Sequence, residues 1–153
     1  MSRKGFTAVE LMIVVILIGV IAAIGFPKIR QALDKSNVRS ARVSITTFVA
    51  IARGSAVQRG CGAVVHFVSG TTSRAWVTAC PRFTAGAGTV DTVATIDDLE
   101  ARFNVSMQAT TDSVQYDPRG LRRDNALTIV RFSGNSASNT DSVTINQMGK
   151  VVR

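Results

Sequence analysis

The sequence is poor in the side chains that build metal centres and disulfide scaffolds, since its 153 residues include two cysteines and one histidine. A scaffold of several disulfides or several structural zinc sites is therefore excluded. Aromatic residues make up only 6% and charged residues 18%, whereas hydrophobic residues reach 46%, so the chain is not of the disordered, highly charged class. Its length is that of one ordinary domain.

Acidic residues are scarce in the first half of the chain, and the formal net charge is +8. Residues 28–82 hold nine basic residues against the single Asp34, while residues 91–124 hold seven acidic residues against four basic ones. Because the charge is so unevenly spread, we expect one face or end of the protein to attract anions.

Most of the hydrophobic excess lies in residues 6–26, where Glu10 is the only ionisable side chain. As a helix these 21 residues would be about 31 Å long, which matches the hydrocarbon core of a bilayer. The segment is apolar all round, so it offers no solvated face. It predicts a membrane-spanning helix, with Gly19, Gly25 and Pro27 as the positions where such a helix can bend.

A secretory signal peptide is the alternative interpretation of this segment, with Arg3 and Lys4 as its basic region and cleavage after Ala22. Glu10 argues against it, because an ionised carboxylate in an apolar segment costs about 2 to 3 kcal/mol on insertion scales and is usually paired or functional. A carboxylate that reaches the headgroups near the helix end is the other interpretation of Glu10. Basic residues flank the segment on both sides, so charge alone leaves its orientation open.

Residues 3–27, which begin RKGFTAVELMIVV, resemble the class III leader of type IV pilins and pseudopilins. This resemblance implies that a prepilin peptidase in the membrane cuts after Gly5 and methylates the new amino terminus at Phe6. It also implies that Glu10 is needed for filament assembly. A buried carboxylate and a buried ammonium are each costly in lipid, so our hypothesis is that Glu10 of one subunit neutralises the Phe6 amine of its neighbour and sets the stagger between them.

Beyond Pro27 the pattern becomes amphipathic and predicts a helix over residues 28–59. Its apolar side chains recur at spacings of three and four and form one stripe, which consists of Val38, Ala41, Ile45, Phe48, Val49, Ala52 and Ala56. Gly60 is placed to end the helix.

Residues 61–153 are predicted to be rich in β-strands. Residues 63–69 and 74–79, joined by a turn at residues 70–73, predict a hairpin. Further strands are predicted over residues 104–109, 113–116, 126–132 and 142–147, with a short last piece after Gly149. Residues 84–90 are a Gly-rich stretch without a periodic pattern, and Thr95 with Asp98 suggests a helix-capping box.

This order, one long helix followed by an antiparallel sheet, resembles the pilin fold, which is an α+β fold. The hairpin that closes on Cys80-Pro81, the segment YDPRG at residues 116–120 and the ending GKVVR at residues 149–153 resemble the minor pseudopilins of the GspH/FimT family. The resemblance implies a leader over residues 1–5, a transmembrane and assembly helix over residues 6–27, and a periplasmic globular domain over residues 28–153.

Cys61 and Cys80 bracket the predicted hairpin, one before its first strand and one after its second. A disulfide between them suits a domain outside the cytoplasm, and the separation of their Cα atoms decides whether it can form.

The sequence suggests no catalytic or metal site. His66 lies within a predicted strand, and no nucleophile and orienting acid are indicated around it, so we interpret it as a packed strand residue. Asp97, Asp98 and Glu100 are interpreted as capping or solvated charges rather than as a cation site. The Gly-rich stretch lacks the Lys-Ser/Thr pair of a phosphate-binding loop. We therefore expect no enzyme, no cofactor and no metal.

Arg119, Arg122 and Arg123 cluster in a predicted turn, and Lys150 and Arg153 end the chain. Lysine and arginine at mobile sites can contact phosphates without reading sequence, although solvated charge is the simpler interpretation. Some members of the resembled family bind DNA through a carboxy-terminal motif that contains glycine and arginine. Its nearest match here is Gly149, Lys150 and Arg153, where a lysine stands at the first arginine position and the second basic residue comes one place late.

The resemblance thus implies two functions. The first is a minor pilin or pseudopilin, a structural and assembly subunit of a type II secretion pseudopilus or a type IV pilus, held in the bacterial inner membrane by one helix. The second is a DNA-binding minor pilin for natural transformation. The implied partners are other pilin or pseudopilin subunits, the prepilin peptidase, the inner membrane and, for the second function, DNA. A secreted enzyme is the least favoured alternative, since no catalytic constellation is present.

Overall fold

The computed structural model describes residues 7–81, 89–135 and 139–152. The chain divides into two compact units, residues 1–33 and residues 34–153, and each is described by itself. Helix α1 (Ala8–Arg59) begins in the first unit and ends in the second, and it continues through Pro27.

In the first unit, α1 exposes its large hydrophobic side chains from Val9 to Leu33. By length and composition this part of the helix can cross a membrane. Glu10 is the only carboxylate among its described residues, and the basic residues Lys28 and Arg30 follow the apolar stretch.

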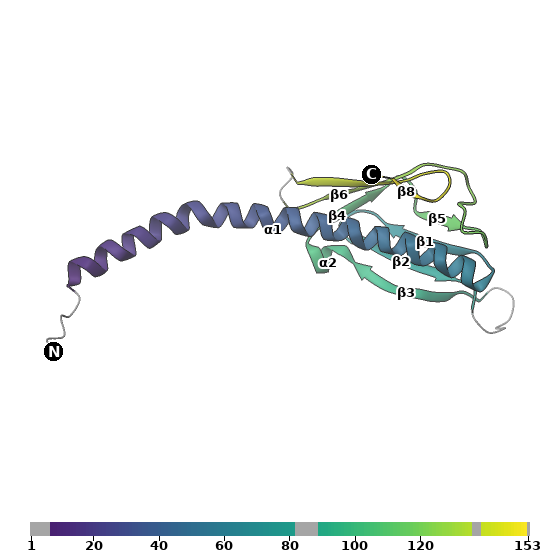
Figure 1. Cartoon of the computed structure of the whole chain (residues 1–153), viewed down its shortest axis with the longest axis horizontal. Coiled ribbons are helices and arrows are strands. Elements are labelled where there is room, and N and C mark those ends of the chain that lie inside the picture. Colours follow the sequence, from purple (N-terminus) through teal and green to yellow (C-terminus); the bar gives the residue numbers. More distant parts are fainter. Residues whose placement is uncertain (1–6, 82–88, 136–138, 153) are drawn as a thin grey trace. The chain divides into compact units, whose positions relative to one another are not determined.

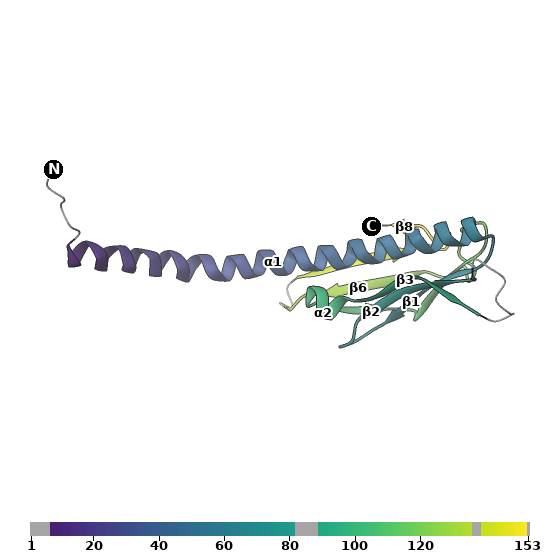
Figure 2. The same cartoon turned by 90° about the horizontal axis from the view of Figure 1, so that it is seen from below.

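The second unit packs residues 34–59 of α1 on two antiparallel sheets (Figures 1 and 2). The first sheet has the spatial order β3-β2-β1-β5 and consists of β1 (Ala63–Val68), β2 (Arg74–Ala79), β3 (Asp91–Asp98) and β5 (Ser113–Tyr116). The second has the order β4-β6-β7-β8 and consists of β4 (Ser106–Ala109), β6 (Thr128–Ser133), β7 (Thr140–Ile145) and β8 (Val151–Val152). A short helix, α2 (Leu99–Phe103), joins β3 to β4. The predicted α+β fold class, one long helix packed on antiparallel sheets, is confirmed.

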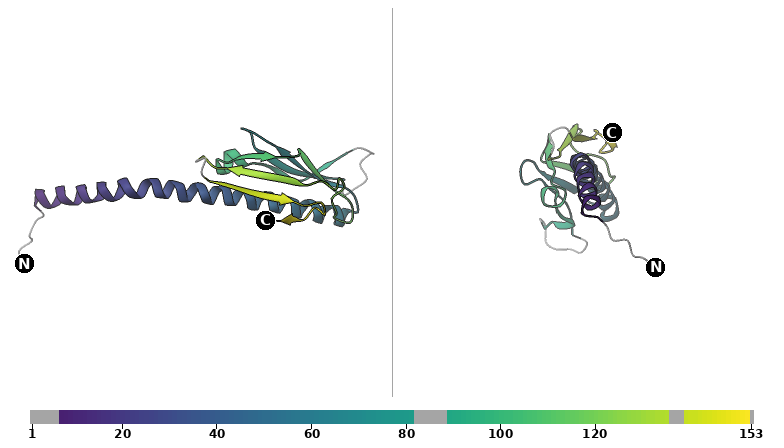
Figure 3. Two further views of the ribbon diagram at one scale, coloured as in Figure 1. Left: turned by 90° about the horizontal axis from the view of Figure 1, so that it is seen from above. Right: turned by 90° about the vertical axis from the view of Figure 1, so that its left-hand side faces the viewer.

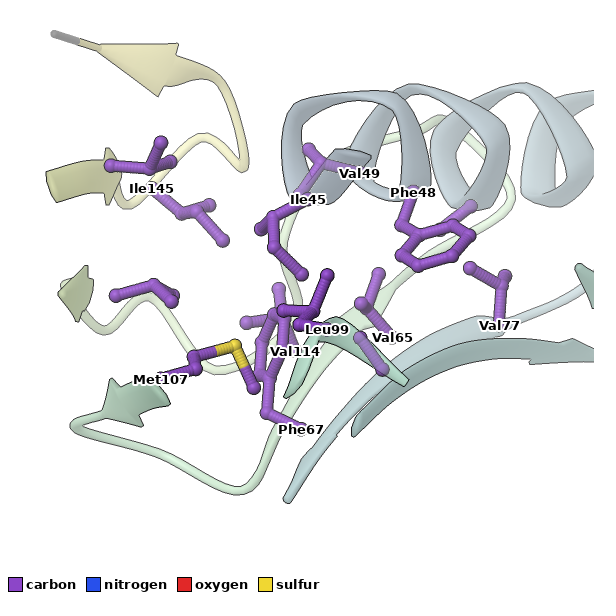
Figure 4. Packing of buried hydrophobic residues seen from close by; sticks show 14 of the residues in the cluster. Ile45, Phe48, Val49, Val65, Phe67, Val77, Leu99, Met107, Val114 and Ile145 are labelled. Carbon is purple, nitrogen blue, oxygen red and sulfur yellow. The ribbon is translucent and has the colours of Figure 1, made fainter. Parts of the chain in front are cut away.

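The helical stripe predicted from the sequence is the face that packs on the sheets. All seven of its apolar side chains are buried, and Ser55 is buried beside them. Figure 4 shows Ile45, Phe48 and Val49 directed toward sheet residues such as Val77 and Ile145. Burial of such side chains stabilises the fold by about 1.5 to 3 kcal/mol each.

The hairpin predicted from the sequence is also confirmed, because β1 and β2 pair antiparallel from Ala63 with Ala79 to Val68 with Arg74. The helix ends where predicted, since Gly60 has a φ of 65°, in the left-handed region that glycine adopts without strain.

The sequence did not predict β3, and it indicated a helix start at Thr95, whereas α2 starts after Asp98, one of the residues interpreted as capping charges. Strand β3 has no fully buried residue, so it lacks the alternation of apolar and polar residues that marks a half-buried strand. The predicted capping box at Thr95 is wrong, because Thr95 lies within β3 and Asp98 is the residue that caps α2. The Asp98 carboxylate accepts a hydrogen bond from the Ala101 backbone N–H at 3.0 Å.

The start of the packed part of α1 is held by Asp34. Its carboxylate accepts hydrogen bonds from the Asn135 backbone N–H at 2.9 Å and from the Asn139 side-chain amide at 2.8 Å. A β-carbon at Gly134 would lie only 2.5 Å from Asp34 Oδ1, so the close approach requires glycine there. Asp34 therefore ties α1 to the segment between β6 and β7.

Candidate functional site

Glu10 closes a capping box with Thr7 at the start of α1. The backbone N–H and the hydroxyl of Thr7 each donate to Glu10 Oε2 at 3.0 Å, and the Glu10 N–H donates back to Thr7 Oγ1 at 3.3 Å. Within the single chain, the carboxylate is thus held at the end of the helix by its own neighbour. Gly5 and Phe6, the predicted sites of cleavage and methylation, lie outside the described residues.

Cys61 and Cys80 are joined by a disulfide in the structure, with their Cα atoms 6.3 Å apart. The bond lies just beyond the pair of Ala63 and Ala79, where the hairpin of β1 and β2 opens. Beside it, Arg59 donates from Nη1 to the Cys80 carbonyl at 2.5 Å and to Asp91 Oδ2 at 2.9 Å. The end of α1 and the open end of the hairpin are therefore linked.

His66 is a packed strand residue in the structure. Its ring stacks on Trp76 with centroids 4.9 Å apart, and its Nε2 lies 2.8 Å from Thr78 Oγ1. Partial burial lowers the pKa of His66 below its usual value. Across the described ranges, no three His, Cys, Asp or Glu side chains gather as a metal site.

The segment YDPRG forms a tight turn against the last turns of α1. The Asp117 carboxylate accepts hydrogen bonds from the backbone N–H groups of Arg119 at 3.0 Å and Leu121 at 2.8 Å, which fixes the turn. Arg53 Nε donates to the Gly120 carbonyl at 3.0 Å. A β-carbon at Gly120 would lie 3.1 Å from Val57, so the turn rests directly on the helix.

The turn between β7 and β8 meets the same place from the other sheet. The buried Tyr116 hydroxyl donates to the Gly149 carbonyl at 3.0 Å, and a β-carbon at Gly149 would collide with the Tyr116 ring. Such a β-carbon would also lie 3.3 Å from Arg122 Cβ. The structure therefore brings the 119–123 loop and Lys150 together, although the sequence places them in separate segments.

Arg122 differs from the expectation of a mobile, solvated cation, since its side chain has no exposed surface. Its Nε and Nη2 donate to the Asp124 carboxylate, Nη2 at 2.9 Å from Oδ2, and its Nη1 has no hydrogen-bond partner among the described residues. Hydrogen bonds from Arg122 hold the pKa of Asp124 below its usual value. Arg122 is buried because it pairs with Tyr116 and lies under Gly149.

Arg119, Arg123 and Lys150 are exposed at this place, and we call these three residues the basic corner. Gly149 and Lys150 belong to an ordered turn rather than to a mobile tail, because Asn146 Oδ1 accepts hydrogen bonds from Met148 N at 3.1 Å and Lys150 N at 2.8 Å. Arg153 lies outside the described residues.

Replacing Gly149 by alanine should destabilise the protein by about 2 kcal/mol, because the new methyl group collides with the Tyr116 ring at a strained positive φ. The φ of Gly149 is 74°. Thermal unfolding of the detergent-solubilised full chain measures the effect. The matched control is Gly54→Ala in α1, where a β-carbon meets nothing within 4 Å, and it should leave the midpoint unchanged or raise it. Equal midpoints for Gly149→Ala and the unaltered protein would contradict the close packing.

Burial raises the pKa of Tyr116 to about 12. The chain has one tyrosine, so phenolate absorbance reports this group alone. In the unfolded chain the pKa is about 10, so the stability that the buried neutral phenol contributes is full below about pH 10 and is lost as the pH rises through about 12. At about pH 11 the folded protein should show little phenolate, whereas the denatured control should show mostly phenolate. Equal phenolate in both samples would contradict the burial of Tyr116.

Comparison with solved structures finds the type IV minor pilin FimU of Pseudomonas aeruginosa strain PAO1 in two crystal forms. The form in space group P21 superposes with a TM-score of 0.59 at 10% sequence identity, covering 76% of this chain and 87% of that one. The form in space group P65 gives a TM-score of 0.55 at 12% identity, covering 74% and 90%. No protein-family model matches the sequence. The chain thus has the fold of a type IV pilin-like protein.

Proposed function

We propose that this chain is a minor pilin or pseudopilin of the GspH/FimT kind, a subunit of a type IV pilus or a type II secretion pseudopilus. The observation that carries the proposal is the combination of a pilin-like fold with an apolar helix that holds one carboxylate, Glu10, near its start. That carboxylate is costly in lipid unless it is paired, and a neighbouring subunit is the natural source of a partner.

The outer ridge of the packed part of α1 supports assembly as well. Between Arg39 and Gln58 the exposed positions of this ridge carry no charge, and they are Val43, Thr47, Ala50 and Val57, with the half-buried Gly54 between the last two. A solvated helix face ordinarily carries charged residues, whereas small and apolar ones allow close helix packing. The ridge therefore suits contact with other helices in a filament.

In this proposal a prepilin peptidase cuts after Gly5 and methylates Phe6, and the helix holds the subunit in the inner membrane until it enters the filament. Glu10 then leaves Thr7 and neutralises the amine of Phe6 in the neighbouring subunit. The subunit would thus act by packing in the filament rather than by catalysing a reaction.

The alternative function, DNA uptake, would use the basic corner. The side chains around that corner fit a protein partner better than DNA.

The test is the intact mass of the protein extracted from membranes of cells that contain a prepilin peptidase. We expect the mass of a chain that begins at methylated Phe6, and we expect to recover that chain in sheared filaments. A product that begins near Ala23, or an uncut chain absent from filaments, would overturn the proposal. Measuring the mass with and without reductant also reports the bond between Cys61 and Cys80, because its reduction adds the mass of two hydrogen atoms.

A further inference from the structure

We propose that the basic corner docks another protein subunit of the same filament, one whose surface presents carboxylates around an apolar centre. This inference rests on the proposed function as a filament subunit. It assigns a partner to the end of the second unit at which α1 ends, opposite the end that Asp34 holds (Figures 1 and 3).

Three exposed apolar side chains lie beside the basic corner. Met148 is 67% exposed, Val57 is 55% exposed and Leu121 is 43% exposed. They lie on the three segments that meet at the corner, because Gly120, which precedes Leu121, rests on Val57, and Gly149, which follows Met148, rests on Arg122. Exposed apolar groups rimmed by polar ones mark interaction sites, and methionine and arginine are both enriched in protein interfaces.

The cations of the basic corner have no carboxylate partner among the described residues, whereas five of the ten described arginines of the second unit have one. The paired arginines are Arg42 with Asp141, Arg59 with Asp91, Arg74 with Asp98, Arg102 with Asp97 and Arg122 with Asp124. The two carboxylates close to the corner are already engaged, Asp117 by backbone N–H groups and Asp124 by Arg122. The three exposed cations are therefore complementary to carboxylates from outside the chain.

The corner is also rigid before any partner arrives. The side chains of Tyr116 and Arg53 donate hydrogen bonds to the carbonyl groups of Gly149 and Gly120, respectively. The Asn146 side chain accepts hydrogen bonds from the backbone N–H groups on both sides of Gly149. A surface whose backbone is already ordered loses little conformational entropy on binding, so more of the contact energy appears as affinity.

A protein fits this surface better than DNA or a second copy of the chain. Contacts to the DNA backbone need hydrogen-bond donors and positive charge, and they leave Met148, Val57 and Leu121 without a role. A second copy that used the same corner would bring like charges together, which is unfavourable. A protein surface with carboxylates around an apolar residue can pair with the three cations and also cover the three exposed apolar side chains.

The experiment uses the full chain in its native host, with a photo-crosslinking phenylalanine derivative at Met148 and, in a second variant, at Leu121. Filaments are sheared from irradiated cells and the adducts are mapped by mass spectrometry. We expect an adduct with a peptide of another pilin-like subunit that contains Asp or Glu. The same derivative at Gln108, an exposed residue of β4, should give no such adduct.

Charge reversal then tests whether the cations of the basic corner contribute to docking. Arg123→Glu with Lys150→Glu should lower the yield of the adduct by about tenfold or more, since like charges replace complementary ones. Arg131→Glu is the matched control, because Arg131 is an exposed cation on β6 without a carboxylate partner among the described residues. It should leave the yield unchanged.

The outcomes separate the two proposals. A chain that enters filaments but gives no adduct from either position contradicts the docking surface and leaves the assembly function standing. A chain absent from sheared filaments contradicts the assembly function and the docking proposal with it. An adduct that a nuclease removes identifies DNA as the partner, and an adduct with a second copy identifies self-contact, and either overturns the proposal.

Discussion

Replacing Glu10 by alanine should leave membrane insertion and cleavage largely intact while removing the chain from filaments. In our proposal the carboxylate neutralises the amine of Phe6 on a neighbouring subunit, so its loss leaves that ammonium unpaired in lipid. An unpaired charge there costs about 2 to 3 kcal/mol, which corresponds to a loss of about thirtyfold or more in incorporation. Quantitative immunoblots of membranes and of sheared filaments measure the ratio.

The structure shows why this variant needs a matched control, since Glu10 also caps α1 through Thr7. Thr7→Ala removes the threonine hydroxyl from the capping box but keeps the carboxylate. It should cost about 1 kcal/mol in the first turn and leave incorporation close to normal. Normal incorporation of Glu10→Ala would contradict the pairing, and an equal loss with Thr7→Ala would assign the effect to the helix cap instead.

Removing the disulfide should be the largest single change in the stability of the second unit. The bond closes a sequence separation of 19 residues between Cys61 and Cys80. The chain-entropy model predicts about 3 kcal/mol for a loop of that length, and the thermal midpoint should fall by about 10 °C. Fluorescence of Trp76, the single tryptophan, follows unfolding of the detergent-solubilised full chain.

The double variant Cys61→Ser with Cys80→Ser gives the reduced state without added reductant. Reductant should lower the midpoint of the unaltered protein to that of the double variant, and it should leave the double variant unchanged. If reductant changes neither the mass nor the midpoint of the unaltered protein, the two cysteines are not bonded in the protein as isolated.

The elements that depend on local periodicity were predicted well. The stripe from Val38 to Ala56 repeats at helical spacing, and the hairpin of β1 and β2 combines strand residues with a turn, so each pattern lies within one short segment. The apolar run before Pro27 was also evident, because length and composition alone identify a candidate membrane helix.

Strand β3 was missed, and the start of α2 was misplaced. Strand β3 has no fully buried residue, and the five residues of α2, of which only Leu99 is buried, are too few to show a helical repeat. Strand bounds in the structure also differ from the predicted ones. Strand β7 begins at Thr140, whereas its predicted start was Ser142, because backbone pairing with β6, rather than side-chain type, determines where the strand begins.

The sequence by itself determined the apolar helix with its one carboxylate, the amphipathic helix that follows and the succession of strands, because those depend on residues close together in the chain. Only the tertiary structure decided that Arg119 and Arg123 are exposed while Arg122 between them is buried. It also decided that Gly149 meets Tyr116, across a separation of 33 residues. Such contacts depend on how two sheets pack against a helix, and that packing is set by the whole set of buried side chains rather than by any one segment.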